Sequence, residues 1–316
     1  MECQNCFKAK SLNCNLYNYD IKNCFVFPLE NIKKFRDKTI NKQMTIDPNY
    51  NTNKITIYDC FDFSQKAELM RGFFCKKCRG YSDAVCVEKI FNLPNILIII
   101  LDRGWGNIYD IIVDFYAEID LSDYVLLNNK KYIYCIYGII TYVQESNEKG
   151  HFIAICKSPV DKKWYKYDDT IVTSVDSSKV ENFNPYVIFY QKINKTQIQK
   201  TYNKFTFLKT PQIGLSNIGS TCYMNATLQC FSQTIPLTKY FLNQKNIETI
   251  KGKEDSTKRL SNAYYEVIQN LWPLNNLPSV KYFSPYNFKN VLGSINELFK
   301  KMEACDAKDL IIFFLE

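Results

Sequence analysis

The sequence around one cysteine reads Gly214-Leu-Ser-Asn-Ile-Gly-Ser-Thr-Cys-Tyr-Met-Asn-Ala-Thr-Leu-Gln229, which places the thiol of Cys222 directly after a glycine turn. Apolar residues follow at helical spacing, so a helix is predicted to begin at this cysteine, with Ser220 and Thr221 as candidate caps. A helix N-terminus lowers the pKa of a thiol through its dipole and free N–H groups, and the thiolate is the form that attacks. The stretch therefore predicts a cysteine nucleophile, and the amide of Asn217 is a candidate donor to an oxyanion beside it.

A thiol nucleophile needs a base, and the chain contains one histidine, His151. It lies in Gly150-His-Phe-Ile-Ala-Ile-Cys156, whose alternating apolar residues predict a strand. The segment Lys163-Trp-Tyr-Lys-Tyr-Asp-Asp-Thr170 is the predicted hairpin partner and would bring Asp168 back beside the imidazole. A carboxylate at that place fixes the tautomer and the orientation of the ring. Taken without the cysteine stretch, a histidine packed against a strand would be the simpler interpretation.

Both stretches resemble sequence boxes of the ubiquitin-specific proteases. The cysteine stretch is similar to the pattern G-L-x-N-x-G-x-T-C-Y-M-N, and the histidine stretch to G-H-[YF] followed by W-x-x-[FY]-D-D. The resemblance implies that Cys222 is the nucleophile, His151 the general base and Asp168 its orienting carboxylate, with Asp169 as a supporting acid. It also implies cleavage of isopeptide or peptide bonds at the C-terminal glycine of ubiquitin, with ubiquitin or ubiquitinated proteins as partners.

Two C-x2-C pairs point to a metal site, because four thiolates in a tetrahedron select zinc. The pairs are Cys3 with Cys6 and Cys75 with Cys78, and the gap between them is longer than in a compact zinc ribbon. The protease family carries two such pairs at the tip of its finger subdomain, so the resemblance implies a structural zinc here. No catalytic cofactor is expected. In the alternative interpretation, the first pair is frayed or idle near the N-terminus.

The composition is that of a folded enzyme, since hydrophobic residues make up 46% and aromatic residues 15% of the chain. Thirteen cysteines without a secretion signal predict reduced thiols, and therefore a cytoplasmic or nuclear protein that is not secreted. No apolar run approaches the roughly 18 residues that span a bilayer, so no membrane association is expected. The net charge of +8 is scattered along the sequence, which argues against a nucleic-acid partner. The oligomeric state is left open.

The order of these segments differs from that of the family, in which the cysteine box comes first and the histidine box last. Residues 1–191 are predicted to form a finger and palm half that carries the histidine box. Residues 192–210 are a predicted basic linker, and residues 211–316 a helical thumb half that carries the cysteine box. The expected fold class is α+β, a papain-like cysteine peptidase with helical thumb, β-rich palm and zinc-ribbon finger, in permuted or tandem-fragment order.

Two accounts of this order stay open. In the first, the chain is a circularly permuted deubiquitinating protease whose halves dock into one site, and the linker, which reaches about 60 Å when extended, permits this. In the second, the chain is a catalytically incomplete ubiquitin-binding fragment that spans two tandem protease domains. Departures from the family pattern, such as Tyr142 at a position that often holds a second histidine and Asp309 in place of a glutamate, leave the inferred triad intact.

Two other functions would account for fewer of the sequence motifs. A protease for a ubiquitin-like modifier would place its nucleophile in a Q-x-x-x-D-C-G context, which Ser220-Thr-Cys-Tyr223 does not match. A zinc-knuckle nucleic-acid binder would need basic and aromatic residues clustered around both cysteine pairs, and it leaves the two catalytic boxes unexplained.

Overall fold

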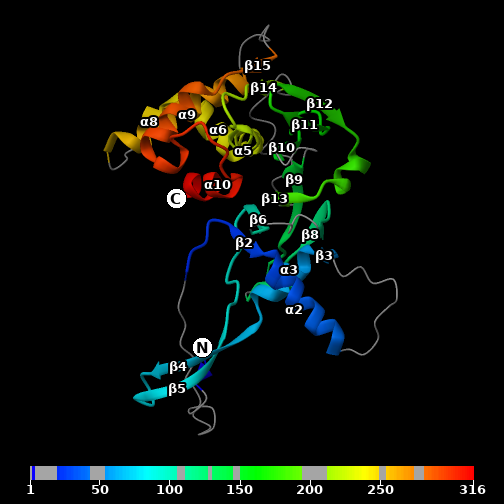
Figure 1. Ribbon diagram of the computed structural model, residues 1–316, viewed down its shortest axis with the longest axis vertical. Coiled ribbons are helices and arrows are strands. Elements are labelled where there is room, and N and C mark those ends of the chain that lie inside the picture. The colour runs from blue at the N-terminus through cyan, green and yellow to red at the C-terminus, as the bar shows by residue number, and fades with distance from the viewer. Residues whose placement is uncertain are drawn as a thin grey trace.

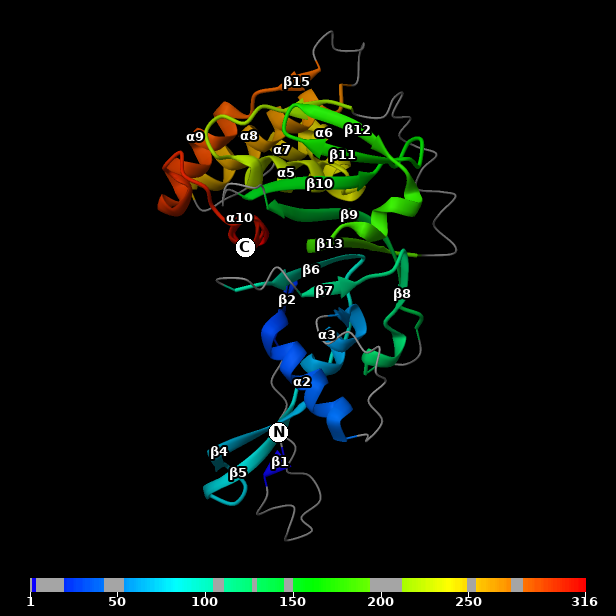
Figure 2. The same ribbon diagram turned by 45° about the vertical axis from the view of Figure 1, so that its right-hand side comes forward.

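The computed structural model describes residues 2–3, 20–42, 54–104, 111–126, 130–144, 150–193, 212–248, 254–273 and 281–316. Helices cover one side of a large sheet in the upper body, and a narrow finger extends below it (Figures 1 and 2). Within these ranges, no helix is both long enough and apolar enough to cross a membrane. The expected α+β class is confirmed.

The central element is an eight-stranded sheet in the order β12-β11-β10-β9-β13-β6-β2, with β8 pairing the end of β9. Its strands are β2 (Phe25–Pro28), β6 (Ile96–Asp102), β8 (Glu118–Asp120), β9 (Ile133–Gln144), β10 (Gly150–Lys157), β11 (Trp164–Asp168), β12 (Ile171–Val175) and β13 (Pro185–Lys192). The predicted hairpin of the histidine stretch is confirmed, because β10 and β11 pair antiparallel with Ala154 opposite Tyr167.

The middle of strand β10, residues 152–156, is apolar because both of its faces are buried there. Successive side chains of a strand point to opposite faces. Phe152, Ala154 and Cys156 belong to the hydrophobic core on the thumb side, whereas Ile153 and Ile155 belong to a second core on the other side. The sheet therefore separates two cores, and residues at the ends of its strands are free to carry chemistry.

The thumb half consists of helices that surround one central helix, α5 (Cys222–Ser232). The others are α6 (Ile235–Leu242), α7 (Gln244–Glu248), α8 (Glu254–Leu271), α9 (Tyr286–Ile295), the 3-10 helix η4 (Glu297–Phe299) and α10 (Ala307–Leu315). Every residue of α5 is buried, because the helix packs against β9, β10 and β11 on one side and against α6 and α10 on the other. The prediction that a helix begins at Cys222 is confirmed.

The second core lies below the sheet, where α2 (Leu29–Lys42) and α3 (Ile57–Ser64) pack. Helix α3 begins at a capping box in which Thr56 and Asp59 each satisfy the backbone N–H group of the other. The remaining elements are short strands and 3-10 helices: β3 (Lys54–Thr56) paired with β7 (Ile112–Asp114), β14 (Gly214–Leu215) paired with β15 (Tyr282–Phe283), η2 (Ser122–Tyr124) and η3 (Ser177–Asn182).

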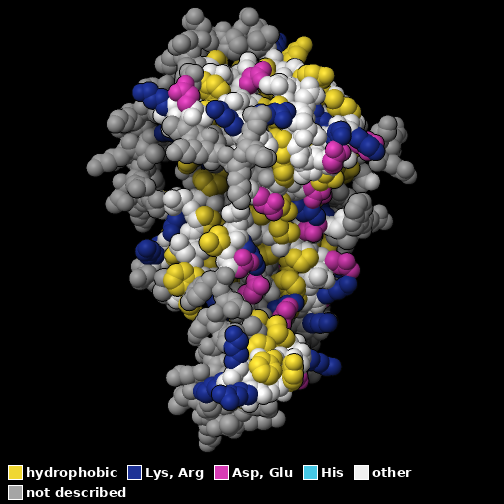
Figure 3. Space-filling view, turned by 90° about the vertical axis from the view of Figure 1, so that its left-hand side faces the viewer, with side chains coloured by type: hydrophobic (Ala, Val, Ile, Leu, Met, Phe, Trp, Pro, Cys, Tyr) yellow, Lys and Arg dark blue, Asp and Glu magenta, His cyan; other side chains and the backbone are white. Residues whose placement is uncertain are grey.

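The finger is a three-stranded sheet in which β5 (Gly80–Val87) lies between β4 (Ala67–Cys75) and β1 (Glu2–Cys3). Apolar side chains are exposed on it, and Figure 3 shows hydrophobic side chains beside lysine and arginine at this lower end of the molecule. These exposed residues are Leu69, Met70, Phe74, Tyr81 and Val87. Exposed apolar patches of this kind mark interaction surfaces.

The two halves of the sequence share one hydrophobic core. The ring of Phe189 in β13 lies 5.9 Å from that of Phe231 in α5, which in turn lies 5.1 Å from Phe314 in α10. The end of α10 also contacts the finger and palm half, since Asn23 Nδ2 donates to the carbonyl oxygen of Leu315 at 2.8 Å. Most of the predicted linker 192–210 lies outside the described residues, so the domain boundaries stay a prediction.

Replacing Phe231 by alanine is expected to destabilise both halves together by about 3–5 kcal/mol, because it opens a cavity in the shared core. Urea unfolding followed by circular dichroism and tryptophan fluorescence measures this, since Trp164 lies in one half and Trp272 in the other. The control is Tyr240→Ala, which removes an exposed aromatic ring. Two separate transitions, of which only one shifts in Phe231→Ala, would contradict a shared core.

Candidate active site

The turn before α5 is shaped by Asn217 rather than by a helix cap. Its Oδ1 accepts hydrogen bonds from the N–H groups of Gly219 at 3.2 Å and Thr221 at 3.0 Å. Gly219 has φ of +120° and Ser220 has φ of +51°, so the chain reverses sharply just before Cys222. Of the two candidate caps, Thr221 occupies the N-cap position, whereas Ser220 lies in the turn before it. The hydroxyl of Thr221 makes no capping bond, because it accepts from the N–H of Ile218 inside the turn.

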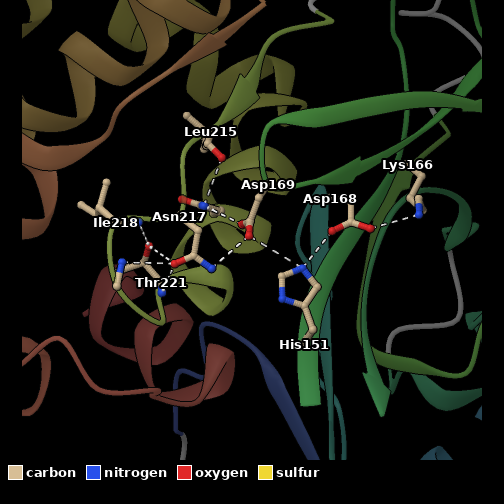
Figure 4. Close-up of polar contacts among 10 residues, drawn as sticks. His151, Lys166, Asp168, Asp169, Leu215, Asn217, Ile218 and Thr221 are labelled. Atoms are coloured by element: carbon tan, nitrogen blue, oxygen red, sulfur yellow. Dashed lines mark hydrogen bonds and ion pairs between the residues drawn. The ribbon is translucent and has the colours of Figure 1, made fainter. Parts of the chain in front are cut away.

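His151 and Asp168 meet at the end of the hairpin, as Figure 4 shows. The distance between His151 Nε2 and Asp168 Oδ1 is 2.9 Å. Asp168 is the last residue of β11, and its second oxygen accepts from Lys166 Nζ at 3.1 Å. The carboxylate is therefore held from both sides, and it holds the imidazole ring in one orientation.

Cys222 is 8% exposed at the first position of α5, and its thiol is a hydrogen-bond partner of His151. This hydrogen bond is the largest cause of a rise in the pKa of His151 from 6.5 to about 9. Burial acts in the opposite direction, whereas the charge on Cys222, the hydrogen bond with Asp168 and the charge on Asp169 add to the rise. The arrangement therefore favours the imidazolium form next to the sulfur.

The carboxyl group of Asp168 is tuned by opposing effects. Burial, the largest of them, raises its pKa, but hydrogen bonds and charge from Lys166 and His151 together outweigh burial and lower the pKa below its usual range. Asp168 is therefore ionised at neutral pH and accepts a hydrogen bond from the ring. This is the state in which it can orient His151.

Asp169 joins three segments of the chain. Its side chain accepts from Asn225 Nδ2 at 2.8 Å and from Asn217 Nδ2 at 2.9 Å, and its backbone oxygen accepts from the N–H of Leu215 at 2.8 Å. The approach is so close that a Cβ on Gly214 would lie 2.6 Å from the backbone oxygen of Asp169. Asp169 therefore connects the histidine hairpin directly to the turn and helix of the cysteine stretch (Figure 4).

Asn225 is a residue of this network that the sequence reasoning missed. It is buried one turn along α5 from Cys222, so that both side chains lie near the same face of the helix. Its position at the end of the Cys-Tyr-Met-Asn motif could have indicated a role in the site. Asp169 itself also lies 3.8 Å from His151 Nε2, farther than Asp168.

Tyr142, the departure from the family pattern, stands opposite Phe152 in the pairing of β9 with β10. Its ring lies at 4.9 Å from that of Phe152, edge to face. The ring fills the space next to Gly150, where an added Cβ would fall 1.6 Å from Tyr142 Cζ. A residue larger than glycine before His151 would therefore displace this ring.

One of the two cysteine pairs of the predicted zinc site lies among the described residues of the finger. Cys75 ends β4 and is buried, Cys78 follows in the turn, and the N–H of Cys78 donates to Cys75 Sγ at 3.5 Å. The backbone of Cys3 pairs with β5, whereas the side chain of Cys3 and all of Cys6 lie outside what the structure describes. Among the described side chains, no group of three or more metal-binding residues occurs, so the four-cysteine site stays a prediction.

The pKa of His151 can be measured directly, because it is the only histidine of the chain and gives one set of imidazole NMR signals. We expect a titration midpoint near pH 9 in the folded protein. Cys222→Ala removes the largest cause of the rise, so it should lower the midpoint most, and Asp168→Asn should lower it less.

The raised pKa of His151 also makes the stability of the folded protein depend on pH. The pKa is higher in the folded than in the unfolded chain, so the stabilisation is complete below about pH 6.5 and is lost as the pH rises through about 9. In Cys222→Ala this loss should become smaller. A midpoint near 6.5 in the parent protein would show that the thiol and the imidazole do not interact.

The chain is similar in sequence to known ubiquitin carboxyl-terminal hydrolases. The chain is 35% identical over 105 residues to ubiquitin carboxyl-terminal hydrolase 15 of Homo sapiens, which covers 33% of this chain and 10% of that protein. It is 28% identical over 173 residues to ubiquitin carboxyl-terminal hydrolase 8 of Saccharomyces cerevisiae, which covers 48% of this chain and 36% of that protein. The chain thus spans much less than two thirds of the length of these relatives.

Among solved structures, the chain is similar to the SAGA Ubp8/Sgf11/Sus1/Sgf73 DUB module bound to ubiquitin aldehyde, with a TM-score of 0.38 and 23% identity. That similarity covers 45% of this chain and 36% of the other. The model of the family described as ubiquitin carboxyl-terminal hydrolase matches residues 1–190 and 213–316, which is most of the chain. The chain belongs to the ubiquitin carboxyl-terminal hydrolase family.

Proposed function

We propose that this chain is a deubiquitinating cysteine protease that hydrolyses isopeptide or peptide bonds at the C-terminal glycine of ubiquitin. One observation carries the proposal: the single histidine contacts both a carboxylate, Asp168, and the thiol of Cys222 at the start of a buried helix. Family membership supports ubiquitin as the substrate. The exposed apolar residues of the finger offer a surface on which a protein substrate can rest.

The contacts between the halves favour the permuted account over the tandem-fragment account. In a fragment of two tandem domains, His151 and Cys222 would each face an absent partner and lie far apart. Here Asp169 receives hydrogen bonds from Asn217 and Asn225, which belong to the other half. The shared core adds to these contacts. We therefore place Cys222, His151 and Asp168 in one site built from one chain.

The proposed mechanism follows from the two nitrogens of the imidazole. Asp168 occupies Nε2, so Nδ1 is the nitrogen that takes the thiol proton from Cys222. The thiolate attacks the carbonyl carbon of the glycine, and the imidazolium then gives its proton to the departing lysine amine. Water hydrolyses the resulting thioester, with His151 as the base that activates it.

The negative oxygen of the tetrahedral intermediate needs donors close to the sulfur. The backbone N–H of Cys222 belongs to the first turn of α5, where no intrahelical acceptor exists. Asn217 Nδ2 carries two hydrogens; one points to Asp169, and the other is available to the oxyanion. One such donor typically accelerates the reaction roughly 10²–10³-fold. The hydrogen bond from Asn217 to Asp169 holds the amide in the orientation that this role requires.

We propose further that Cys3, Cys6, Cys75 and Cys78 hold a structural zinc ion, which would tie the first residues of the chain to the finger. The turn at Cys75 and the pairing of β1 with β5 support this assignment. The described cysteines carry no disulfide, which suits a reducing compartment and our placement of the protein in the cytoplasm or nucleus.

The decisive experiment mixes the purified chain with ubiquitin that carries a thiol-reactive group at its C-terminus, followed by intact mass measurement. We expect one ubiquitin adduct per chain, no adduct in Cys222→Ala and a strongly slowed adduct in His151→Ala. The matched control is Cys135→Ser, which removes another partly buried thiol from β9 and should react like the parent. A folded chain that binds ubiquitin without forming the adduct would support the incomplete binding fragment instead.

The metal proposal has its own measurement. Elemental analysis of the purified chain should give one zinc per chain, and both Cys75→Ser and Cys78→Ser should lose it. Cys86→Ser, in the neighbouring strand β5, should retain the metal. A metal content that is unchanged in Cys75→Ser would rule out this site.

A further inference from the structure

Lys289 in α9 is a lysine whose ammonium group lies inside the thumb. The residue is 2% exposed, which is unusual because lysine is almost never fully buried without partners. Burial lowers its pKa, and the nearby Cys305 acts in the opposite direction. In the described part of the chain, it forms no ion pair with a carboxylate. Its position must therefore be held by hydrogen bonds.

Three oxygen acceptors surround this ammonium group. It donates to the carbonyl oxygen of Phe299, to the carbonyl oxygen of Lys301 at 2.9 Å, and to the hydroxyl of Tyr223 at 3.4 Å. An ammonium group has three N–H donors, so each donor has one acceptor. Two of these acceptors are backbone groups of the segment 299–301, which the lysine ties to α9.

The third acceptor connects Lys289 to the nucleophile. Tyr223 directly follows Cys222 in α5 and is fully buried, and its ring stacks on that of Phe299 with centroids 6.2 Å apart. The segment held by Lys289 continues into Met302. This residue packs on Gly219 so closely that a Cβ added to the glycine would lie 3.2 Å from the Cβ of Met302. The lysine thus reaches the residue after the nucleophile and supports the turn before it.

We propose that Lys289 is a positioning residue for the thiol nucleophile, acting through Tyr223 and through the segment that packs on the Gly219 turn. This inference rests on the proposed role of Cys222. The Gly219 turn also carries Asn217, so a shift of the turn moves both the sulfur and the oxyanion donor. Small displacements of reacting groups slow a reaction strongly without weakening the binding of the substrate body.

Lys289→Met keeps the apolar stem of the side chain and removes the three donors. We expect kcat for hydrolysis of a fluorogenic ubiquitin substrate, per titrated active site, to fall roughly 10- to 100-fold, with KM changed less than about threefold. The rate of iodoacetamide alkylation at Cys222, followed by peptide mapping, should fall in parallel. Lys300→Met is the matched control, because it removes an exposed lysine of the same segment and should change neither rate.

A second pair of variants separates positioning from general stability. Tyr223→Phe removes the hydroxyl that accepts from Lys289, whereas Tyr264→Phe removes an equally buried thumb hydroxyl that has no partner in the described structure. We expect the first to slow kcat and Cys222 alkylation and the second to leave both unchanged. In the double variant with Lys289→Met, the loss from Tyr223→Phe should largely disappear, since both remove the same contact.

The opposite results would overturn the inference. If Lys289→Met only lowers the melting temperature, while kcat per active site and Cys222 alkylation match the parent, the lysine is purely structural. If Lys289→Met does not fold, Tyr223→Phe against Tyr264→Phe decides the question. A parent chain that hydrolyses no ubiquitin refutes the proposed function, whereas the alkylation rates still test whether Lys289 positions Cys222.

Discussion

The packing of α5 against β10 is the contact on which the rest of the structure depends. The helix begins with Cys222 and the strand begins with Gly150 and His151, so their contact brings the thiol to the imidazole. Because α5 is buried on all sides, its position is determined by the sheet on one side and by the other thumb helices on the other. The chemistry at the N-terminus of α5 therefore depends on a hydrophobic core that extends well away from it.

Polar contacts orient the side chains that this apolar packing brings together. Asp169 orients two asparagines of the cysteine stretch, and Asp168 orients the imidazole, so the two adjacent acids have different partners. In the thumb, Lys289 donates two hydrogen bonds to the segment 299–301 and a third to Tyr223, the residue after Cys222. Buried polar groups of this kind are costly unless they are paired, and these pairs confine the site to one arrangement.

The reversed order of the halves is compatible with this core, because packing depends on which surfaces meet and not on the order in which the chain supplies them. The carbonyl of Leu315 near the C-terminus accepts from Asn23, just before β2, so the two halves also meet at the end of α10. Strand β13 ends the finger and palm half beside β6 and β9. In the proposed permuted protease, the predicted linker 192–210 would connect the two halves.

The sequence by itself determined the local features: a helix that begins at Cys222, a hairpin that returns Asp168 to His151, and the membership of a hydrolase family. These depend on residues close in the chain, whose spacing reflects local hydrogen bonding and alternation of side chains. The sequence also predicted Thr221 at the N-cap of α5, but not that its hydroxyl would bond within the turn and leave the helix without a side-chain cap. Only the tertiary structure decided that His151 meets Cys222, that Asp169 reaches Asn225 and that Lys289 reaches Tyr223. Those contacts join segments far apart in sequence, and they form because burial of a common core brings the segments together, which no local pattern records.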